Sequence, residues 1–160
     1  MRGLFVYIAF LFTCVANPSQ ASAQADEIQW ISFEALEDSL ALHPKNVLID
    51  FYTDWCTYCR KMDKSVFSKP AVIETLNKDF YAIRFNAETD EEIIFGGQLF
   101  VNDQVGESRT PMHQIAQLLA TRDGKFAPPV LLLLDPEFNA LGRNFGYLDS
   151  NQLLEFISTK

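Results

Sequence analysis

The segment Val47 to Met62 constrains the fold of this chain more than any other stretch. The apolar run Val47 to Thr53 predicts a buried strand, and Cys56-Thr57-Tyr58-Cys59 follows at the start of a predicted helix that ends near Phe67. Two thiols three residues apart on a first helical turn can close a tight, reversible disulfide. The backbone N–H groups at a helix start have no intrahelical partner and stabilise a thiolate, the nucleophile of disulfide exchange. The segment therefore predicts thiol–disulfide exchange chemistry.

The N-terminal region has the pattern of a secretory signal peptide. One early cation, Arg2, precedes an apolar run from Gly3 to Phe12, and small residues follow at Ala21-Ser22-Ala23. We therefore expect residues 1–23 to be a signal peptide that is cleaved after Ala23. Residues 24–160 should then form one mature domain.

The N-terminal pattern allows two alternatives. Cleavage after Ala25 is the second choice, because Ala23-Gln24-Ala25 also follows the small-x-small rule. A lipid anchor at Cys14 is not expected, because Phe12 and Thr13 fit a lipoprotein processing site poorly. The apolar run is shorter than the roughly 20 residues that span a bilayer. The mature protein should therefore not span a membrane, and should be periplasmic or secreted.

Charge and cysteine usage narrow the function further. The chain has 21 acidic and 13 basic residues and a formal net charge of −8, which argues against nucleic acid as a partner. Apart from Cys14, its only cysteines are Cys56 and Cys59. An exported protein that relied on disulfides for stability would carry more cysteines at wider spacing. The pair is therefore interpreted as reactive, in a domain that we expect to be monomeric.

The rest of the chain predicts alternating strands and helices. The expected strands are residues 28–31, 47–53, 80–86, 130–134 and 144–147. The expected helices begin at Ser32, Cys56, Pro70, Thr110 and Ser150, and the one from Thr110 should end at Gly124. Two short β-prone runs around Gly96-Gly97 predict a hairpin within Glu91 to Val101. Because the connection between the strands at 47–53 and 80–86 is long, these strands should be parallel. The pattern predicts one α/β domain with a mixed sheet.

Polar and aromatic residues near the cysteines are further candidates for the site. Asp50 interrupts an apolar strand, and a buried carboxylate is costly enough to favour a functional role over a purely structural one. Arg84, on another buried strand, is expected to pair with a carboxylate, and Asp50 is the candidate. Trp55 and Tyr58 are interpreted as an apolar contact patch beside the thiols rather than as plain surface aromatics.

A metal site is the competing interpretation of the cysteine pair. Structural zinc needs four ligands, and the remaining histidines, His43 and His113, lie in unrelated helical contexts. No zinc site is therefore expected. No organic cofactor is expected either, because the pair itself can carry two electrons. A copper-binding or non-catalytic binding module remains the alternative function.

The segment Val47 to Met62 resembles the active-site segment of the thioredoxin family. The residues that carry this resemblance are Asp50 six positions before Cys56, Trp55 directly before it, and Arg60 and Lys61 directly after Cys59. Phe80 to Asn86 is similar to the next strand of the family, and Pro129 before an apolar run matches the family's cis-proline. Residues 53–72 are most similar to exported thioredoxin-like reductases, including the C-terminal domain of membrane-spanning thiol-reductant carriers.

The resemblance implies a thioredoxin fold, with a mixed sheet flanked by helices and a hairpin insertion before the third core helix. It implies a thiol:disulfide reductase in which Cys56 attacks the substrate disulfide, Cys59 resolves the mixed disulfide and Asp50 moves the proton of Cys59 through water. The implied substrate-contact residues are Trp55, Thr57, Tyr58, Pro128 and Pro129. The implied partners are protein or peptide thiols and disulfides, with a membrane protein supplying electrons.

This sequence departs from the family pattern at two places. The residue before the family's cis-proline normally offers its backbone N–H to an extended substrate, and Pro128 has no N–H. Binding of the substrate main chain should therefore be weaker or be made by other groups. The hairpin of Glu91 to Val101, which the smallest family members lack, is expected either to add a substrate surface or to cover a sheet edge.

Overall fold

The computed structural model describes residues 26–158. The predicted signal peptide, its cleavage site and Cys14 lie outside this range. The described elements are, in order, β1 (Trp30–Ile31), α1 (Phe33–Leu42), β2 (Asn46–Tyr52), α2 (Thr57–Ser65), α3 (Pro70–Asp79), β3 (Phe80–Asn86), β4 (Ile93–Phe95), β5 (Gln98–Phe100), α4 (Gln114–Leu119), β6 (Val130–Leu134), β7 (Ala140–Phe145) and α5 (Ser150–Ser158).

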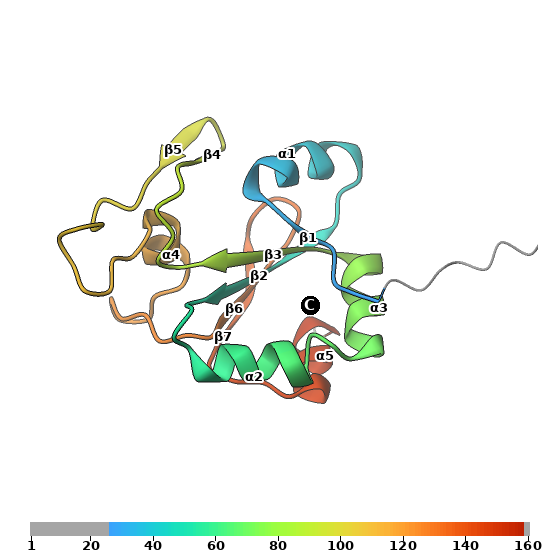
Figure 1. Ribbon diagram of the computed structural model, residues 1–160. Helices are drawn as coiled ribbons and strands as arrows, with labels where there is room; N and C mark the ends of the chain where they lie inside the picture. Colours follow the sequence, from blue (N-terminus) through green and yellow to red (C-terminus); the bar gives the residue numbers. More distant parts are fainter. Residues whose placement is uncertain (1–25, 159–160) are drawn as a thin grey trace, which may run out of the picture.

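A mixed sheet with the strand order β1-β3-β2-β6-β7 forms the centre of the fold (Figure 1). As predicted, β2 and β3 are parallel, and β1 is parallel to β3 at the edge. Strand β6 runs antiparallel to β2, and β7 runs antiparallel to β6. Residues Val47 to Phe51 and all of β6 are buried, because helices cover both faces of the central strands.

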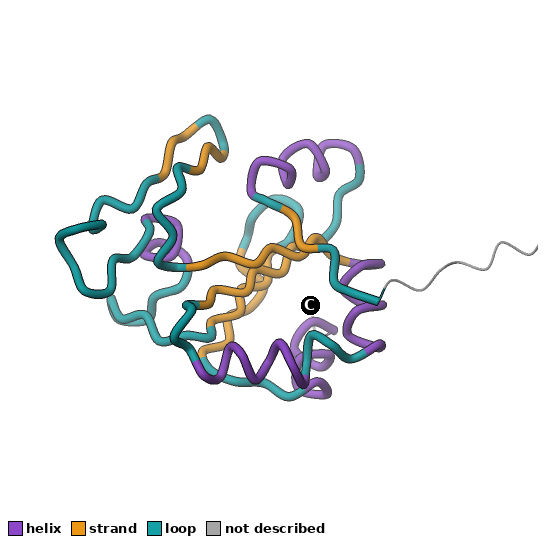
Figure 2. Tube along the Cα trace, in the orientation of Figure 1, coloured by secondary structure: helices purple, strands orange, loops and turns teal. Residues whose placement is uncertain are grey.

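Helices pack on both sides of the sheet (Figure 2). On β2, the odd-numbered side chains such as Ile49 pack with Phe33 and Leu36 of α1 and Ile115 of α4. The even-numbered Leu48 packs on the other face, in a cluster to which α2, α3 and α5 contribute. Side chains alternate between the two faces of a strand. Asp50 therefore points to the face that α2 covers.

Local sequence signals explain several element boundaries. The Ser32 side chain accepts the Ala35 N–H, which caps α1 as predicted. Pro70 occupies the start of α3, where its missing N–H leaves no hydrogen bond unmade. Gly96 and Gly97 connect β4 to β5 with φ of 61° and 70°, angles that glycine adopts at low steric cost. The predicted hairpin and the predicted strand Phe80 to Asn86 are confirmed.

Two predicted boundaries around α4 are wrong. The helix begins at Gln114 and not at Thr110, because the His113 ring accepts the Ile115 N–H and caps the helix there. It ends at Leu119, well before Gly124. Residues Arg122 to Lys125 form an isolated bridge, with positive φ at Asp123 and Gly124. This tight turn cannot continue a right-handed helix.

The C-terminal predictions also need two corrections. Strand β7 begins at Ala140 and not near Asn144, because the Asp135 side chain accepts the N–H groups of Glu137 and Asn139 and completes the turn early. Helix α5 is capped by Asp149, whose Oδ1 accepts two N–H groups of the first turn, and Ser150 is its first residue. Within residues 26–158, no helix has both the length and the apolar character needed to cross a membrane.

Candidate active site

Cys56 and Cys59 form a disulfide where the chain leaves the sheet and enters α2. Cys56 is the N-cap of this helix, and Cys59 lies in its first turn, with the two Cα atoms 5.3 Å apart. The Cys59 N–H donates to Cys56 Sγ over 3.1 Å. In the disulfide both are buried almost equally, at 4% and 2% exposure.

This arrangement favours a thiolate on Cys56 after reduction. The N–H that contacts Sγ in the disulfide is a ready donor to a sulfur anion, and the positive end of the α2 dipole lies at the same point. Both effects lower the pKa of a thiol and raise its thiolate fraction at neutral pH. Cys56 is therefore the candidate nucleophile.

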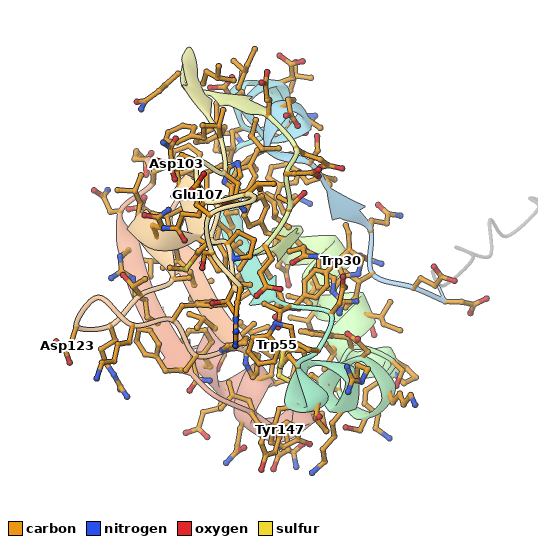
Figure 3. The ribbon with its side chains drawn as sticks, turned by 60° about the vertical axis from the view of Figure 1, so that its left-hand side comes forward. Trp30, Trp55, Asp103, Glu107, Asp123 and Tyr147 are labelled. Carbon is orange, nitrogen blue, oxygen red and sulfur yellow. A yellow bond between two sulfur atoms is a disulfide. The ribbon has the colours of Figure 1, made fainter. Side chains whose placement is uncertain are left out.

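Aromatic side chains lie on the cysteine loop and near it, and Figure 3 labels Trp55 and Tyr147 among them. Trp55 is 57% exposed and Tyr58 60% exposed. The Trp55 indole N–H lies 3.0 Å from each carboxylate oxygen of Glu88, so the ring is held by the loop after β3. Tyr58 lies 6.2 Å from the ring of Tyr147. Together they form an apolar rim that a partner protein can contact.

Arg60 and Lys61, the two basic residues after Cys59, each have the charged group in contact with neighbouring residues. Arg60 donates to the backbone carbonyl of Asp54 and to the hydroxyl of Thr57. Lys61 lies over the Tyr147 ring, 4.4 Å from its centroid. Thr57 therefore contributes to positioning Arg60.

The Pro128–Pro129 peptide bond is cis, and Pro129 is buried at the start of β6. Phe51 of β2 pairs with Val130 of β6, so Pro129 lies at the end of the sheet from which the chain runs to Cys56. The Pro129 carbonyl accepts the Gly146 N–H over 2.8 Å. Pro128 is half-buried.

Asp50 is almost fully buried on the α2 side of the sheet, at 1% exposure. Burial raises its pKa from 3.8 to about 7, while Arg84 lowers it and Asp63 raises it by smaller amounts. Among residues 26–158, Asp50 Oδ1 makes no hydrogen bond. A carboxyl group with a pKa near neutrality can both accept and return a proton at physiological pH.

Arg84 contacts two carboxylates, and the closer is not the predicted one. Its Nη2 lies 2.7 and 2.8 Å from the two oxygens of Asp63, whereas its Nε is 3.6 Å from Asp50 Oδ2. The guanidinium also stacks over Tyr52 at 4.4 Å. The predicted ion pair between Arg84 and Asp50 is confirmed, and Asp63 is a second partner that the sequence did not indicate. Asp63 is the hydrogen-bonded partner, and Asp50 is a more distant neighbour.

Asp63→Asn should lower the pKa of Asp50, because the charge of Asp63 is one of the causes that raise it. The substitution removes a negative neighbour and frees Arg84 to turn toward Asp50. Titration of the Asp50 carboxyl by carbon-13 NMR measures this change directly. Glu74→Gln, an exposed carboxylate on α3, is the matched control and should leave the titration in place. A pKa that does not fall in Asp63→Asn would contradict this account of the charge balance.

No group of three or more His, Cys, Asp or Glu side chains that could hold a metal ion occurs in the described part of the chain. His113 is fully buried, with one ring nitrogen accepting the Ile115 N–H and the other 3.2 Å from the Glu91 carbonyl. It is a helix cap rather than a free ligand.

A family model described as a thioredoxin-like domain matches residues 33–159. The chain belongs to the thioredoxin-like family. Among curated thioredoxin-like relatives, it is 32% identical over 85 residues to the thiol:disulfide interchange protein DsbD of Pseudomonas sp. JR1 / K1, a match that covers 48% of this chain and 14% of that protein. DsbD of Pseudomonas fluorescens is 42% identical over 53 residues, covering 33% and 9%. The matches thus span a small part of these much longer relatives.

Solved thioredoxin-like structures share the architecture. A DsbH oxidoreductase superposes with a TM-score of 0.60 at 14% identity, over 89% of this chain and 90% of that one. The oxidised C-terminal domain of Neisseria meningitidis DsbD gives 0.53 at 22% identity, over 79% and 90%. A Thermus thermophilus thioredoxin gives 0.59 at 21% identity, over 84% and 87%. These likenesses support the thioredoxin fold, and the family together with the Cys56–Cys59 pair supports thiol:disulfide oxidoreductase chemistry.

Sequence reasoning missed several residues of this thioredoxin-like site. Asp63 lies four positions after Cys59, on the same side of α2, and this spacing was the one signal that could have found it. Glu88 and Tyr147 had no such signal, because each reaches the cysteine loop from a distant part of the chain. Only the sheet order brings them beside Trp55 and Tyr58.

Proposed function

We propose that this chain is an exported thiol:disulfide reductase that reduces or repairs protein disulfides. The observation that carries the proposal is the cysteine pair at the start of α2, with the Cys59 N–H donating to Cys56 Sγ. In the reduced protein, this N–H would stabilise a thiolate at Cys56, and Cys59 would lie close enough to form a disulfide with it. The long thiol:disulfide interchange relatives support the same chemistry.

The proposed reaction is a two-step exchange. In the reduced protein, the Cys56 thiolate attacks one sulfur of a substrate disulfide, so that a Cys56–substrate disulfide forms and the other substrate sulfur leaves as a thiolate. Cys59 then loses its proton and attacks Cys56 Sγ. The Cys56–Cys59 disulfide forms, and the second substrate sulfur leaves. Two electrons pass to the substrate, and the protein ends in the disulfide form.

In this proposal, Asp50 is the base for the second step. It lies on the sheet face that α2 covers, and its pKa of about 7 allows it to take up the proton of Cys59, through water, at neutral pH. Arg84 and Asp63 are positioning residues, because they set the charge around Asp50. No organic cofactor enters the proposed reaction.

The proposed location and partner follow from the N-terminal sequence pattern. A chain exported by a signal peptide of residues 1–23 works in an oxidising compartment, periplasmic or extracellular. A reductase there needs a supply of electrons, and we propose a membrane-bound dithiol protein that reduces the Cys56–Cys59 disulfide. The exposed Trp55 and Tyr58, with Thr57, Pro128 and Pro129, are proposed to contact both this partner and the substrates.

The reduction potential should lie below roughly −200 mV, nearer to reducing than to oxidising members of the family. Thr57 and Tyr58 place no cation between the cysteines, and the carboxyl of Asp50 opposes a charged sulfur when it ionises. The Cys59 N–H and Lys61 act in the other direction. Equilibration of residues 24–160 with glutathione buffers measures the potential. A value near −120 mV, with a Cys56 pKa near 4, would make the protein an oxidase.

Turnover distinguishes the proposed reductase from a binding module of the same fold. Insulin reduction by the mature domain, with dithiothreitol as the electron source, should exceed the rate with dithiothreitol alone. Counting free thiols in the same sample verifies that Cys56 and Cys59 are reduced. Intact thiols with only the background rate would favour the binding module.

A further inference from the structure

An open groove runs along the edge of the sheet beside the second half of β3. It has a volume of about 590 Å³. Its floor is formed by the residues from Ile83 to Asn86, and its walls by the start of α1 and by the segment from Thr89 to Ile93. In Figure 1, α1 and the β4–β5 hairpin both lie above β3. None of the residues named in the proposed redox reaction except Arg84 lines it.

The groove exists because the edge strand is shorter than its neighbour. Strand β1 pairs with β3 only at Trp30–Ala82 and Ile31–Ile83. Ser32 then caps α1, and the chain turns away from the sheet. Strand β3 continues to Asn86. Within residues 26–158, no strand pairs with this last part of β3 on the β1 side.

The exposed edge presents a matched backbone acceptor and donor. The Ala87 N–H donates to the Tyr52 carbonyl of β2. Because the backbone groups of successive residues alternate in direction along a strand, the N–H of Asn86 and the C=O of Arg84 point away from β2, into the groove. One residue of an added parallel strand could donate to the Arg84 carbonyl and accept from the Asn86 N–H. These two bonds would continue the parallel pairing that β1 makes with β3.

Charge and polarity select the kind of strand that fits. The groove carries the carboxylates of Glu34, Glu91 and Glu92. Its one cation, Arg84, is already paired with Asp63 and stacked on Tyr52. Apolar side chains, among them Phe33, Phe85 and Ile93, also line the groove. An extended peptide with alternating apolar and basic side chains complements both properties, whereas an acidic peptide would meet like charge.

We propose that this groove binds an extended, basic segment of a partner protein by strand addition to the edge of β3. Main-chain hydrogen bonds to Arg84 and Asn86 supply the register, and the glutamates select the charge. The groove adjoins the loop that holds Trp55, because Glu88 contacts the indole and Asn86 lies 3.5 Å from the Asp54 carboxylate. A bound segment would therefore anchor a partner beside the disulfide. The proposal concerns binding alone and does not depend on the direction of electron transfer.

The test uses the protein purified after export, in its disulfide form, and acetylated hexapeptides as probes. The first probe alternates valine and lysine, the second alternates valine and glutamate, and the third is the valine–lysine peptide with every second backbone nitrogen methylated. Nitrogen-15 NMR titration should show the Arg84 and Asn86 amide signals shifting with the first probe. The second and third probes should bind at least tenfold more weakly.

Paired variants test the charge selection. Glu91→Gln with Glu92→Gln should weaken binding of the valine–lysine peptide by about fivefold. Each exposed ion pair between a glutamate of the groove and a lysine of the peptide contributes only a small part of the binding free energy. Asp103→Asn with Glu107→Gln removes two exposed carboxylates from the loop after β5 (Figure 3) and should leave the affinity unchanged. Equal binding of the methylated or the acidic peptide would overturn the proposal. Amide shifts confined to the β4–β5 hairpin would overturn it as well.

Discussion

Cys59→Ser should accumulate a stable mixed disulfide between Cys56 and a substrate protein, whereas Cys56→Ser should not. Cys56 Sγ accepts the Cys59 N–H at the start of α2, so it is the sulfur favoured as a thiolate. Without the Cys59 thiol, the first exchange proceeds and the second cannot. In both variants the rate of insulin reduction should fall to the uncatalysed background.

Reaction of each reduced variant with a disulfide-containing protein, followed by non-reducing electrophoresis and mass spectrometry, measures the trapped species. The double variant, which has no thiol in residues 24–160, is the control for non-covalent association. Because both sulfurs are buried almost equally in the disulfide, exposure alone does not predict this asymmetry. Equal trapping by the two single variants would show that the helix N-terminus does not decide which sulfur attacks.

Asp50→Asn should slow the resolving step by roughly 10- to 1000-fold at neutral pH. The carboxyl of Asp50, with its pKa raised to about 7 by burial, is partly ionised there and can take up the proton of Cys59. Asparagine is similar in shape but cannot accept that proton. Single-turnover kinetics of mixed-disulfide decay isolate the step. An unchanged rate would return Asp50 to a structural role.

The same substitution should stabilise the protein in a pH-dependent way. Because the folded-state pKa of Asp50 lies above 3.8, ionisation costs folding free energy progressively as the pH rises from about 4 to about 7, and the full cost remains above that range. The change in pKa corresponds to about 4 kcal/mol at most. Asparagine leaves an uncharged polar group buried at the same place, which offsets part of this, so the expected gain is about 2 kcal/mol at pH 8 and close to zero at pH 4.

Urea unfolding of the disulfide forms at both pH values measures this difference. Asp38→Asn, an exposed carboxylate on α1 at the opposite face of the sheet, is the matched control and should change stability little at either pH. A stabilisation of Asp50→Asn that is equal at pH 4 and pH 8 would mean that the buried charge is not its cause.

The sequence by itself determined the elements whose signals are local. The apolar run of β2, the alternation in Phe80 to Asn86 and the paired glycines of the hairpin depend on side-chain spacing and backbone freedom. These features predicted a mixed α/β sheet, and the family match and the structure confirm it. The Cys56–Cys59 spacing likewise predicted a reactive disulfide at a helix start, because a four-residue motif contains its own geometry.

Only the tertiary structure decided which distant groups meet. The sequence predicted the ion pair of Arg84 with Asp50, which the structure contains at 3.6 Å, but not the closer contact with Asp63, which the packing of α2 brings to 2.7 Å from the guanidinium. Glu88 reaches Trp55, and Tyr147 reaches Tyr58, across the fold. The side chains of His113 and Asp149 cap α4 and α5, so these helices begin at other residues than the sequence pattern predicted. Such contacts depend on how layers pack, and packing distances are not encoded in the spacing of residues along the chain.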